Sequence, residues 1–174
     1  MFRKSAQLFF KKTNFKFSDV KSLVLIEHSQ GKISIPSLST LNAAKQLGGE
    51  ITALVTGVES DCENVGKYVS KMEGINKIIL YSNESLKNFI GENVSKAILN
   101  IQKKENYTHI LSNHSAFGKN ILPRLGANLD VQPISDVMTI NSPSNFVRPI
   151  YAGNALCEIG KNKKKKKNFF KNKF

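Results

Sequence analysis

Two short polar segments of the sequence could line a ligand-binding crevice. His28 and Ser29 follow the first apolar run of the chain, and Asn113 and Ser115 follow the fourth. If both runs form neighbouring parallel strands, their carboxyl ends meet at the edge where such sheets bind ligands. Imidazole, amide and hydroxyl groups would suit an adenine nucleotide or acid/base chemistry. These four residues are the candidate nucleotide crevice, although short polar loops also end most parallel strands.

No other pattern in the sequence specifies a catalytic or metal site. Neither G-x-G-x-x-G nor G-x-x-x-x-G-K-[ST] occurs, so the glycine-rich phosphate motifs are missing. His28, His109 and His114 lack the i, i+4 spacing of a helical metal site. Ser115 in HSAFG lacks the glycine that precedes a hydrolase nucleophile by two positions. We therefore assign no catalytic residues and no metal ligands.

A few isolated polar and sulfur-containing residues have ordinary structural explanations. Asp136, Arg124 and Arg148 stand in apolar surroundings, where structural ion pairs are commoner than catalytic groups. Cys62 and Cys157 are too few for a disulfide framework and fit small core residues of a reducing compartment. The sequence has no run of 18 apolar residues, so we expect no membrane insertion.

Apolar runs alternate with helical periodicity through the middle of the chain. This alternation predicts an α/β domain, a three-layer αβα arrangement with a mainly parallel sheet of nucleotide-binding type. The expected strands are Leu23–Ile26, Ile51–Val55, Ile78–Tyr81 and Tyr107–Leu111. The expected helices are residues 39–47, 60–74, 90–101 and 117–129.

Several details of these elements can be predicted from individual residues. Ser60 and Glu63 have the spacing of a capping box at the start of the second helix, which should end near Gly74. Pro123 should kink the last helix or divide it into two short ones. Residues 134–140 and 146–152 are expected to be further strands.

The positive charge of the chain lies in its two tails. The chain has 26 basic and 13 acidic residues, and thirteen of the basic ones lie in residues 1–18 and 161–174, which contain no acid. The region between the tails is therefore neutral. The lysine run alone would suit a nucleic-acid binder, but its charge lies outside the globular region. We expect no nucleic-acid partner.

Residues 1–18 have the composition of a mitochondrial transit peptide. The segment is basic, lacks acids, and as a helix would place Phe2, Phe9 and Phe10 opposite Lys4 and Lys11. We expect it to direct import and to be removed. The alternative is a disordered basic arm with no targeting role.

Residues 161–174 contain only lysine, asparagine and phenylalanine, so we expect a disordered tail. All three residue types can be encoded by adenine and thymine alone. Gly160-Lys161 can be spelled GGT-AAA, which contains a common intron start. We therefore consider the tail a translated intron, with a genuine lysine-rich truncated isoform as the alternative.

Three stretches resemble the α subunit of electron transfer flavoproteins. They are SLVLIEHSQGKISIPSLSTLNAAKQLGGEITALVTG, YTHILSNHSAFGKNILPRLGANLDVQPISDV and FVRPIYAGNAL. The resemblance covers about residues 22–159, and the ordered motifs AFGKN, LPRL and PISDV make the middle stretch the most specific. Residues 19–160 are therefore identified as similar to the N-terminal α/β domain of that subunit.

The resemblance implies an electron carrier of the mitochondrial matrix and no independent enzymatic activity. In that family the α subunit pairs with a β subunit, accepts electrons from acyl-CoA dehydrogenases and passes them to a membrane-bound quinone oxidoreductase. The FAD is held mainly by a second domain, which we expect to be missing here, so no FAD-binding residue can be assigned. We expect a scaffold or interaction domain. The alternative is a stand-alone adenine-nucleotide-binding module.

Overall fold

The computed structural model describes residues 20–160 and 172–173, which fall into two compact units. The first unit is Val20–Pro133, and the second contains residues 134–160 with 172–173. The expected transit peptide and most of the lysine-rich tail lie outside the described residues.

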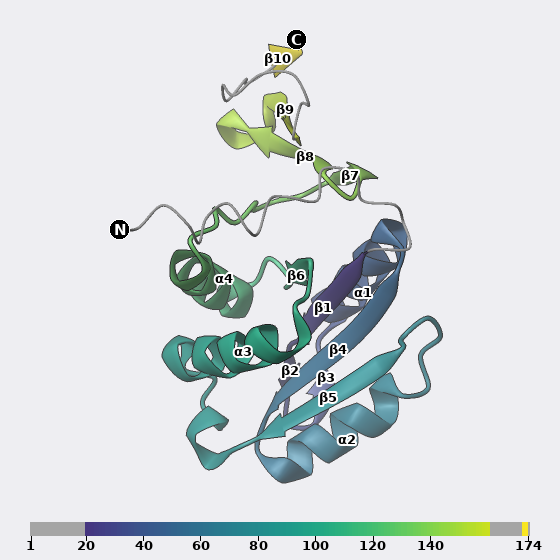
Figure 1. The fold of residues 1–174 in the computed structure, drawn as a ribbon, viewed down its shortest axis with the longest axis vertical. Helices are drawn as coiled ribbons and strands as arrows, with labels where there is room; N and C mark the ends of the chain where they lie inside the picture. The colour runs from purple at the N-terminus through teal and green to yellow at the C-terminus, as the bar shows by residue number, and fades with distance from the viewer. Residues whose placement is uncertain (1–19, 161–171, 174) are drawn as a thin grey trace. The chain divides into compact units, whose positions relative to one another are not determined.

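The first unit contains a parallel sheet of four strands in the order β5-β4-β1-β6 (Figure 1). The strands are β1 (Lys21–Ile26), β4 (Glu50–Gly57), β5 (Lys77–Ser82) and β6 (His109–Leu111). All three strand pairs are parallel, so each connection crosses the sheet through a helix. The four strands expected from the apolar runs are all present, and none of their ends differs by more than two residues from the expected ones.

Alternate side chains of β1 enter two separate hydrophobic cores. Leu23 and Leu25 face one core, and Val24 and Ile26 face the other, all four being completely buried. A strand with two buried faces needs helices on both sides, and each such side chain contributes about 1.5–3 kcal/mol. The three-layer αβα prediction is therefore confirmed.

Two helices cover each face of the sheet (Figure 1). Helices α1 (Ile35–Leu47) and α2 (Glu59–Val69) cover one face. Helices α3 (Gly91–Glu105) and α4 (Ala116–Leu129) cover the other, and a short 3-10 helix, η2 (Glu84–Leu86), precedes α3. An ion pair of 2.6 Å between Arg124 Nη1 and Glu92 Oε1 joins α4 to α3, which confirms the structural role expected for Arg124.

The capping box expected for α2 is wrong. The helix begins at Glu59, one residue before the expected cap, and the capping position is Val58, with no side-chain hydrogen bond. Ser60 therefore lies inside the first turn. Acidic residues in that turn interact favourably with the helix dipole and support the start instead. The helix also ends at Val69, well before Gly74.

Pro123 does not divide α4, which is a single helix of 14 residues. The proline removes one backbone donor, and the carbonyl four residues earlier belongs to Lys119. Both Pro123 and Lys119 are exposed, so water can hydrogen-bond to that carbonyl in place of the missing donor. The expectation of two short helices is wrong for this reason.

The second unit is an antiparallel sheet in the order β10-β9-β8-β7. Its strands are β7 (Thr139–Ser142), β8 (Asn145–Ile150), β9 (Ala155–Gly160) and β10 (Asn172–Lys173), and η3 (Tyr151–Gly153) joins β8 to β9. The strand expected over residues 134–140 is found later, as β7. The sequence did not predict β9, whose Cys157 is buried opposite Arg148 of β8.

In the first unit, a hairpin follows β1 where the sequence suggested only a loop. Strands β2 (His28–Ser29) and β3 (Lys32–Ile33) pair antiparallel around a two-residue turn. Gln30 and Gly31 both have positive φ, 49° and 71°, as a tight hairpin turn with right-handed strand twist requires.

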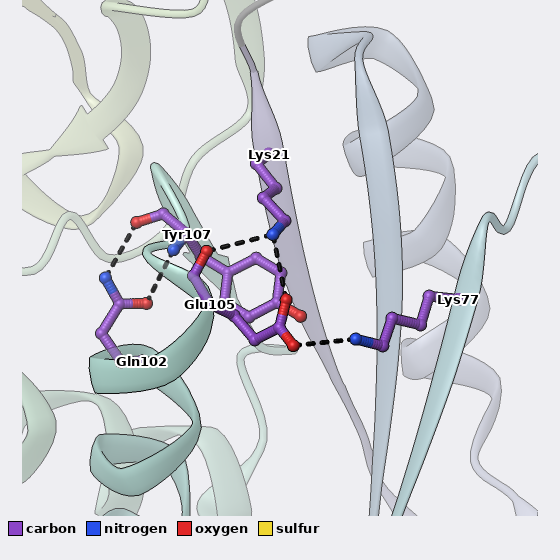
Figure 2. Close-up of polar contacts among 5 residues, drawn as sticks. All are labelled: Lys21, Lys77, Gln102, Glu105 and Tyr107. Atoms are coloured by element: carbon purple, nitrogen blue, oxygen red, sulfur yellow. Dashed lines mark hydrogen bonds and ion pairs between the residues drawn. The ribbon is translucent and has the colours of Figure 1, made fainter.

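Glu105, the last residue of α3, joins this helix to two strands of the sheet (Figure 2). Its carboxylate accepts a hydrogen bond of 2.8 Å from Lys77 Nζ on β5 and one of 3.0 Å from Lys21 Nζ on β1. Lys21 Nζ also donates to the Glu105 backbone carbonyl at 3.0 Å, which satisfies a carbonyl at the helix end. The three residues connect three elements that are distant in sequence.

The loop after α3 is fixed by a second polar contact (Figure 2). The Gln102 side-chain amide donates to the Tyr107 carbonyl at 2.9 Å and accepts from the Tyr107 N–H at 3.1 Å. Lys21 Nζ lies 5.1 Å from the centre of the Tyr107 ring, within the range of a cation–π contact. The chain is therefore held in place as it enters β6.

We predict that the Glu105 contacts contribute to stability only while Glu105 is ionised. Hydrogen bonds from Lys77 and then Lys21 hold the pKa of Glu105 below its usual value. A lowered carboxyl pKa stabilises the fold above the pKa of the unfolded chain, and the effect is lost as the pH falls through the folded pKa. Glu105→Gln should therefore destabilise the protein at neutral pH and have progressively less effect in acid.

Urea denaturation at a series of pH values measures this difference. Glu63→Gln, on the exposed face of α2, is the matched control and should show no such trend. A Glu105→Gln effect that is constant from neutral to acidic pH would contradict the assignment.

Gly118 in α4 allows the helix to approach the chain that follows β6. A Cβ atom at this position would lie 1.9 Å from the Asn113 carbonyl oxygen and 2.8 Å from Ser112 Oγ. Because the nearest atom belongs to the backbone, the contact can be relieved only by moving the backbone of the helix or of the segment after β6. We predict that Gly118→Ala lowers the free energy of unfolding by about 2–3 kcal/mol.

Gly66 in α2 provides the control for this substitution. A Cβ there would meet the end of the Leu80 side chain at 2.9 Å, and Leu80 is 46% exposed and can move. Both substitutions have the same helix-propensity gain. Chemical denaturation should therefore show a large loss for Gly118→Ala and little change for Gly66→Ala, and equal effects would refute the explanation.

Candidate functional site

The strand order brings together the carboxyl ends of the first and fourth parallel strands. From β1 the chain passes to β4 and β5 on one side, then returns to β6 on the other side of β1. Val24 of β1 lies opposite Leu111 of β6, so the residues that follow both strands are neighbours. This reversal of direction is where open α/β sheets bind ligands. We call the residues that meet there, Glu27, Ser34, Asn113 and Ser115, the switch-point cluster.

Glu27 lies at the centre of the switch-point cluster and accepts hydrogen bonds from the segment after β6. Asn113 Nδ2 donates to Glu27 Oε2, and Ser115 Oγ donates to Glu27 Oε1 at 3.1 Å. Asn113 is 5% exposed, and its Oδ1 accepts a hydrogen bond of 3.3 Å from Ser112 Oγ. Two of the four expected site residues are therefore bonded to a carboxylate of the protein itself.

Residues at the start of α1 also form hydrogen bonds with Glu27. Ser34 Oγ donates to Glu27 Oε2 at 3.2 Å, and the Ser34 N–H donates to the Glu27 carbonyl at 2.9 Å. The Glu27 N–H donates to Ser37 Oγ at 2.9 Å. Both the side chain and the backbone of Glu27 thus have partners in the first turn of α1.

The N-termini of two helices meet at Glu27. Ser34 is the N-cap residue of α1 and Ser115 that of α4, and neither hydroxyl caps its own helix. Neither helix has an acidic residue in its first turn. A helix N-terminus carries a partial positive charge and unsatisfied N–H groups, so it favours a nearby anion. The Glu27 carboxylate supplies a negative charge to both helices.

His28 is buried beside this network and does not face solvent. Its side chain is among the buried polar groups, at 3% exposure, and Nε2 lies 2.9 Å from the Thr56 carbonyl oxygen of β4. A carbonyl can only accept, so Nε2 carries the proton and Nδ1 of the neutral ring is an acceptor. Within the described segments Nδ1 has no hydrogen-bond partner. Ser29 is exposed on the β2–β3 hairpin.

Two aromatic rings lie next to His28. The Phe89 ring packs edge-to-face against the His28 ring at 5.1 Å, and Phe117 packs in the same way against Phe89 at 5.5 Å. Phe89 has a positive φ of 50°, an uncommon conformation for a bulky side chain. The imidazole is therefore enclosed by protein groups.

The two cysteines of the chain lie in separate units, Cys62 in the first unit and Cys157 in the second. Burial, with a smaller contribution from Asp61, raises the pKa of Cys62 to about 11, so its thiol is protonated at neutral pH. Both Cys62 and Cys157 are free and buried, as expected from the sequence. Within residues 20–160 and 172–173, no group of three or more His, Cys, Asp or Glu side chains is arranged to hold a metal ion.

A hollow of about 330 Å³ lies elsewhere, between α1 and the connection from α2 to β5. Its lining includes Leu41, Lys45, Met72 and Glu73, none of which belongs to the switch-point cluster. Across the part of the chain that the structure describes, no helix combines the length and apolarity needed to span a bilayer.

The structure brings Asn113 and Ser115 together, and it places His28 in the core and Ser29 at the surface. Sequence reasoning missed Glu27 and Ser34, the two residues that complete the network. A signal was present, because Glu27 is an acid directly after a fully apolar strand, and Ser34 precedes a proline-containing helix start. Those two features together indicate a carboxylate near a helix N-terminus.

Comparisons of the sequence with family models and with known proteins lead to the same family. The family model of the electron transfer flavoprotein domain matches residues 22–166. Over an alignment of 138 residues, the chain is 39% identical to the probable electron transfer flavoprotein subunit alpha, mitochondrial, of Caenorhabditis elegans. The alignment covers 79% of this chain and 41% of that protein.

Two further relatives come from distant organisms. The electron transfer flavoprotein subunit alpha of Pseudomonas aeruginosa is 39% identical over 137 residues, covering 79% of this chain and 43% of that protein. The mitochondrial subunit alpha of Arabidopsis thaliana is 36% identical over 143 residues, covering 80% and 39% respectively. The chain thus spans about two fifths of the length of these relatives. Because the family model covers most of its residues, the chain belongs to the electron transfer flavoprotein family.

Proposed function

We propose that this chain acts as the N-terminal scaffold domain of an electron transfer flavoprotein α subunit and pairs with a β subunit. The family match over residues 22–166 supports this role, as do relatives that are named α subunits. Paired in this way, the domain contributes to an electron carrier rather than to an enzyme. The domain would contribute a surface of its three-layer fold to this pairing.

The electron donors, the electron acceptor and the compartment that we propose follow from the family. The complex would take electrons from acyl-CoA dehydrogenases and deliver them to a membrane-bound quinone oxidoreductase in the mitochondrial matrix. FAD would supply the redox chemistry of the whole carrier. The switch-point cluster does not favour a flavin, because its donors are already hydrogen-bonded to Glu27.

One observation supports the scaffold role most strongly. A carboxylate of the protein lies where this fold would bind the phosphate of a nucleotide. Asn113, Ser115 and Ser34 all donate to Glu27. A phosphate brought to the same position would have to break these bonds and would be repelled by the carboxylate. The geometry therefore favours a structural domain over a nucleotide-binding one.

A stand-alone adenine-nucleotide-binding module is the second candidate, built on His28, Ser29, Asn113 and Ser115. It is favoured by the buried Nδ1 of His28, an acceptor without a hydrogen-bond partner in the described segments. The amino group of an adenine ring could donate to that nitrogen if the neighbouring aromatic rings moved. This candidate requires displacement of Phe89, which packs against His28.

Co-expression tests the scaffold role. We predict that the tagged chain recovers a co-expressed electron transfer flavoprotein β subunit as a stable 1:1 complex, because the domain provides a preformed surface for pairing. The chain purified alone should lack flavin absorbance. A tag-only sample is the control for recovery. Failure to recover the β subunit, or stoichiometric flavin on the isolated chain, would contradict the proposal.

Thermal denaturation with adenosine monophosphate separates the two candidates. A ligand that binds only the folded state raises the melting temperature in a concentration-dependent way. The scaffold role predicts no saturable rise for the wild-type chain. The second candidate predicts a rise that is lost in Asn113→Ala, and such a result would favour it.

A further inference from the structure

We propose that residues 83–90, the segment between β5 and α3, form a lid that opens locally and admits solvent to the buried ring of His28. In the structure this 83–90 lid is closed, with the ring of Phe89 packed against the imidazole. The proposal goes beyond the scaffold role. It concerns a motion within the first unit, and it requires neither a β subunit nor a nucleotide.

The first observation is the strained backbone of the lid at Phe89. This residue has a φ of 50°, in the left-handed region that is unfavourable for a bulky side chain. Its N–H donates to the Leu86 carbonyl at 3.0 Å, so the strained residue lies just after the short helix η2. Chain segments that leave a helix in this conformation usually contain glycine there. A phenylalanine at this point must therefore be stabilised by the contacts of its side chain.

The second observation is the set of ring contacts that oppose this strain. The Phe89 ring packs edge-to-face against His28 of β2 at 5.1 Å and against Phe117 of α4 at 5.5 Å. Aromatic pairs of this geometry are individually weak, of the same order as the cost of one strained residue. The closed lid is therefore held by a small difference between two opposing terms.

The third observation is the weak anchoring of the rest of the lid. Among its eight residues, all of which the structure describes, Leu86 alone is buried, and Ile90 is 47% exposed. Two of its side-chain hydrogen bonds, from the Ser85 N–H to Asn83 Oδ1 and from Asn93 Nδ2 to the Ser85 carbonyl, are exposed to solvent. A segment with few buried contacts and exposed hydrogen bonds opens at a lower free energy than the whole domain.

The lid also covers the side of His28 that is easiest to open. The His28 Nε2 atom lies 2.9 Å from the Thr56 carbonyl oxygen, and a Cβ on Gly57 would lie 3.2 Å from His28 Cε1. Both neighbours belong to β4, which pairs with a strand on each side. The lid has no such support. Solvent therefore reaches the imidazole, which is 3% exposed, most readily when Phe89 leaves it.

Amide hydrogen exchange of the wild-type chain of 174 residues tests the local opening. The hydrogen-bonded amides of Leu86, Lys87 and Phe89 should exchange at least about tenfold faster than those of β4. Low urea should leave their exchange unchanged, because a local opening exposes little surface. Exchange of the lid and of β4 at the same rate, with the same urea dependence, would mean that the lid opens only by global unfolding and would refute the proposal.

Two substitutions of Phe89 test the part played by the strained backbone. Both Phe89→Ala and Phe89→Gly remove the ring, but only glycine accepts a positive φ without strain. We expect the lid amides of Phe89→Ala to exchange about fivefold or more faster than those of Phe89→Gly. Ile90→Ala removes an exposed neighbour and should behave as wild type. Equal exchange in the alanine and glycine variants at position 89 would contradict the role of strain.

Chemical labelling of His28 tests what the lid covers. Diethyl pyrocarbonate acylates accessible neutral imidazoles, and mass spectrometry locates the product, with the exposed His114 as the internal reference. His28 of wild type should be labelled more slowly than His114, and Phe89→Ala should accelerate labelling of His28 at least about tenfold without affecting His114. Amides of β4 are followed in the same samples. If labelling of His28 changes only in proportion to exchange in β4, or not at all, the lid is excluded. None of these measurements involves the β subunit, so failure of the scaffold role would be seen separately.

Discussion

The hydrogen bonds to the Glu27 carboxylate are the interaction on which the arrangement of this domain depends. They join the end of β1 to the first turn of α1 and to the segment that leads from β6 into α4. Helices α1 and α4 cover opposite faces of the sheet, and Glu27 is 86 residues from Asn113 and 88 from Ser115 along the chain. One side chain thus joins distant segments at the point where the order of the strands reverses.

This domain has an architecture that is common among nucleotide-binding proteins, but the hydrogen bonds to Glu27 oppose nucleotide binding. A parallel sheet with a switch point between β1 and β6 is a common setting for nucleotide sites, but the fold alone does not determine function. Here the donors at the switch point are bonded to a protein carboxylate. At the opposite end of the sheet, Glu105 joins α3 to Lys21 and Lys77, so both ends are held by an acid between distant elements.

The sequence predicted most of the sheet because buried parallel strands are continuous apolar runs. Leu23–Ile26 and Ile51–Val55 could be assigned from their composition alone. The ends of α2 and the continuity of α4 could not be predicted in this way. The start of α2 depends on the backbone at Val58, and the continuity of α4 depends on the solvent exposure of Pro123. The site was predictable in part: strand ends indicated Asn113 and Ser115, but the role of Glu27 depends on the pairing of β1 with β6, a contact between distant segments.

A crystal structure of the wild-type chain grown in the presence of phosphate and adenosine monophosphate tests the central claim most directly. The account predicts that Glu27 accepts hydrogen bonds from Asn113, Ser115 and Ser34, with no anion at the starts of α1 and α4. A phosphate group at that position, with the Glu27 side chain turned away from Ser34 and Ser115, would contradict it.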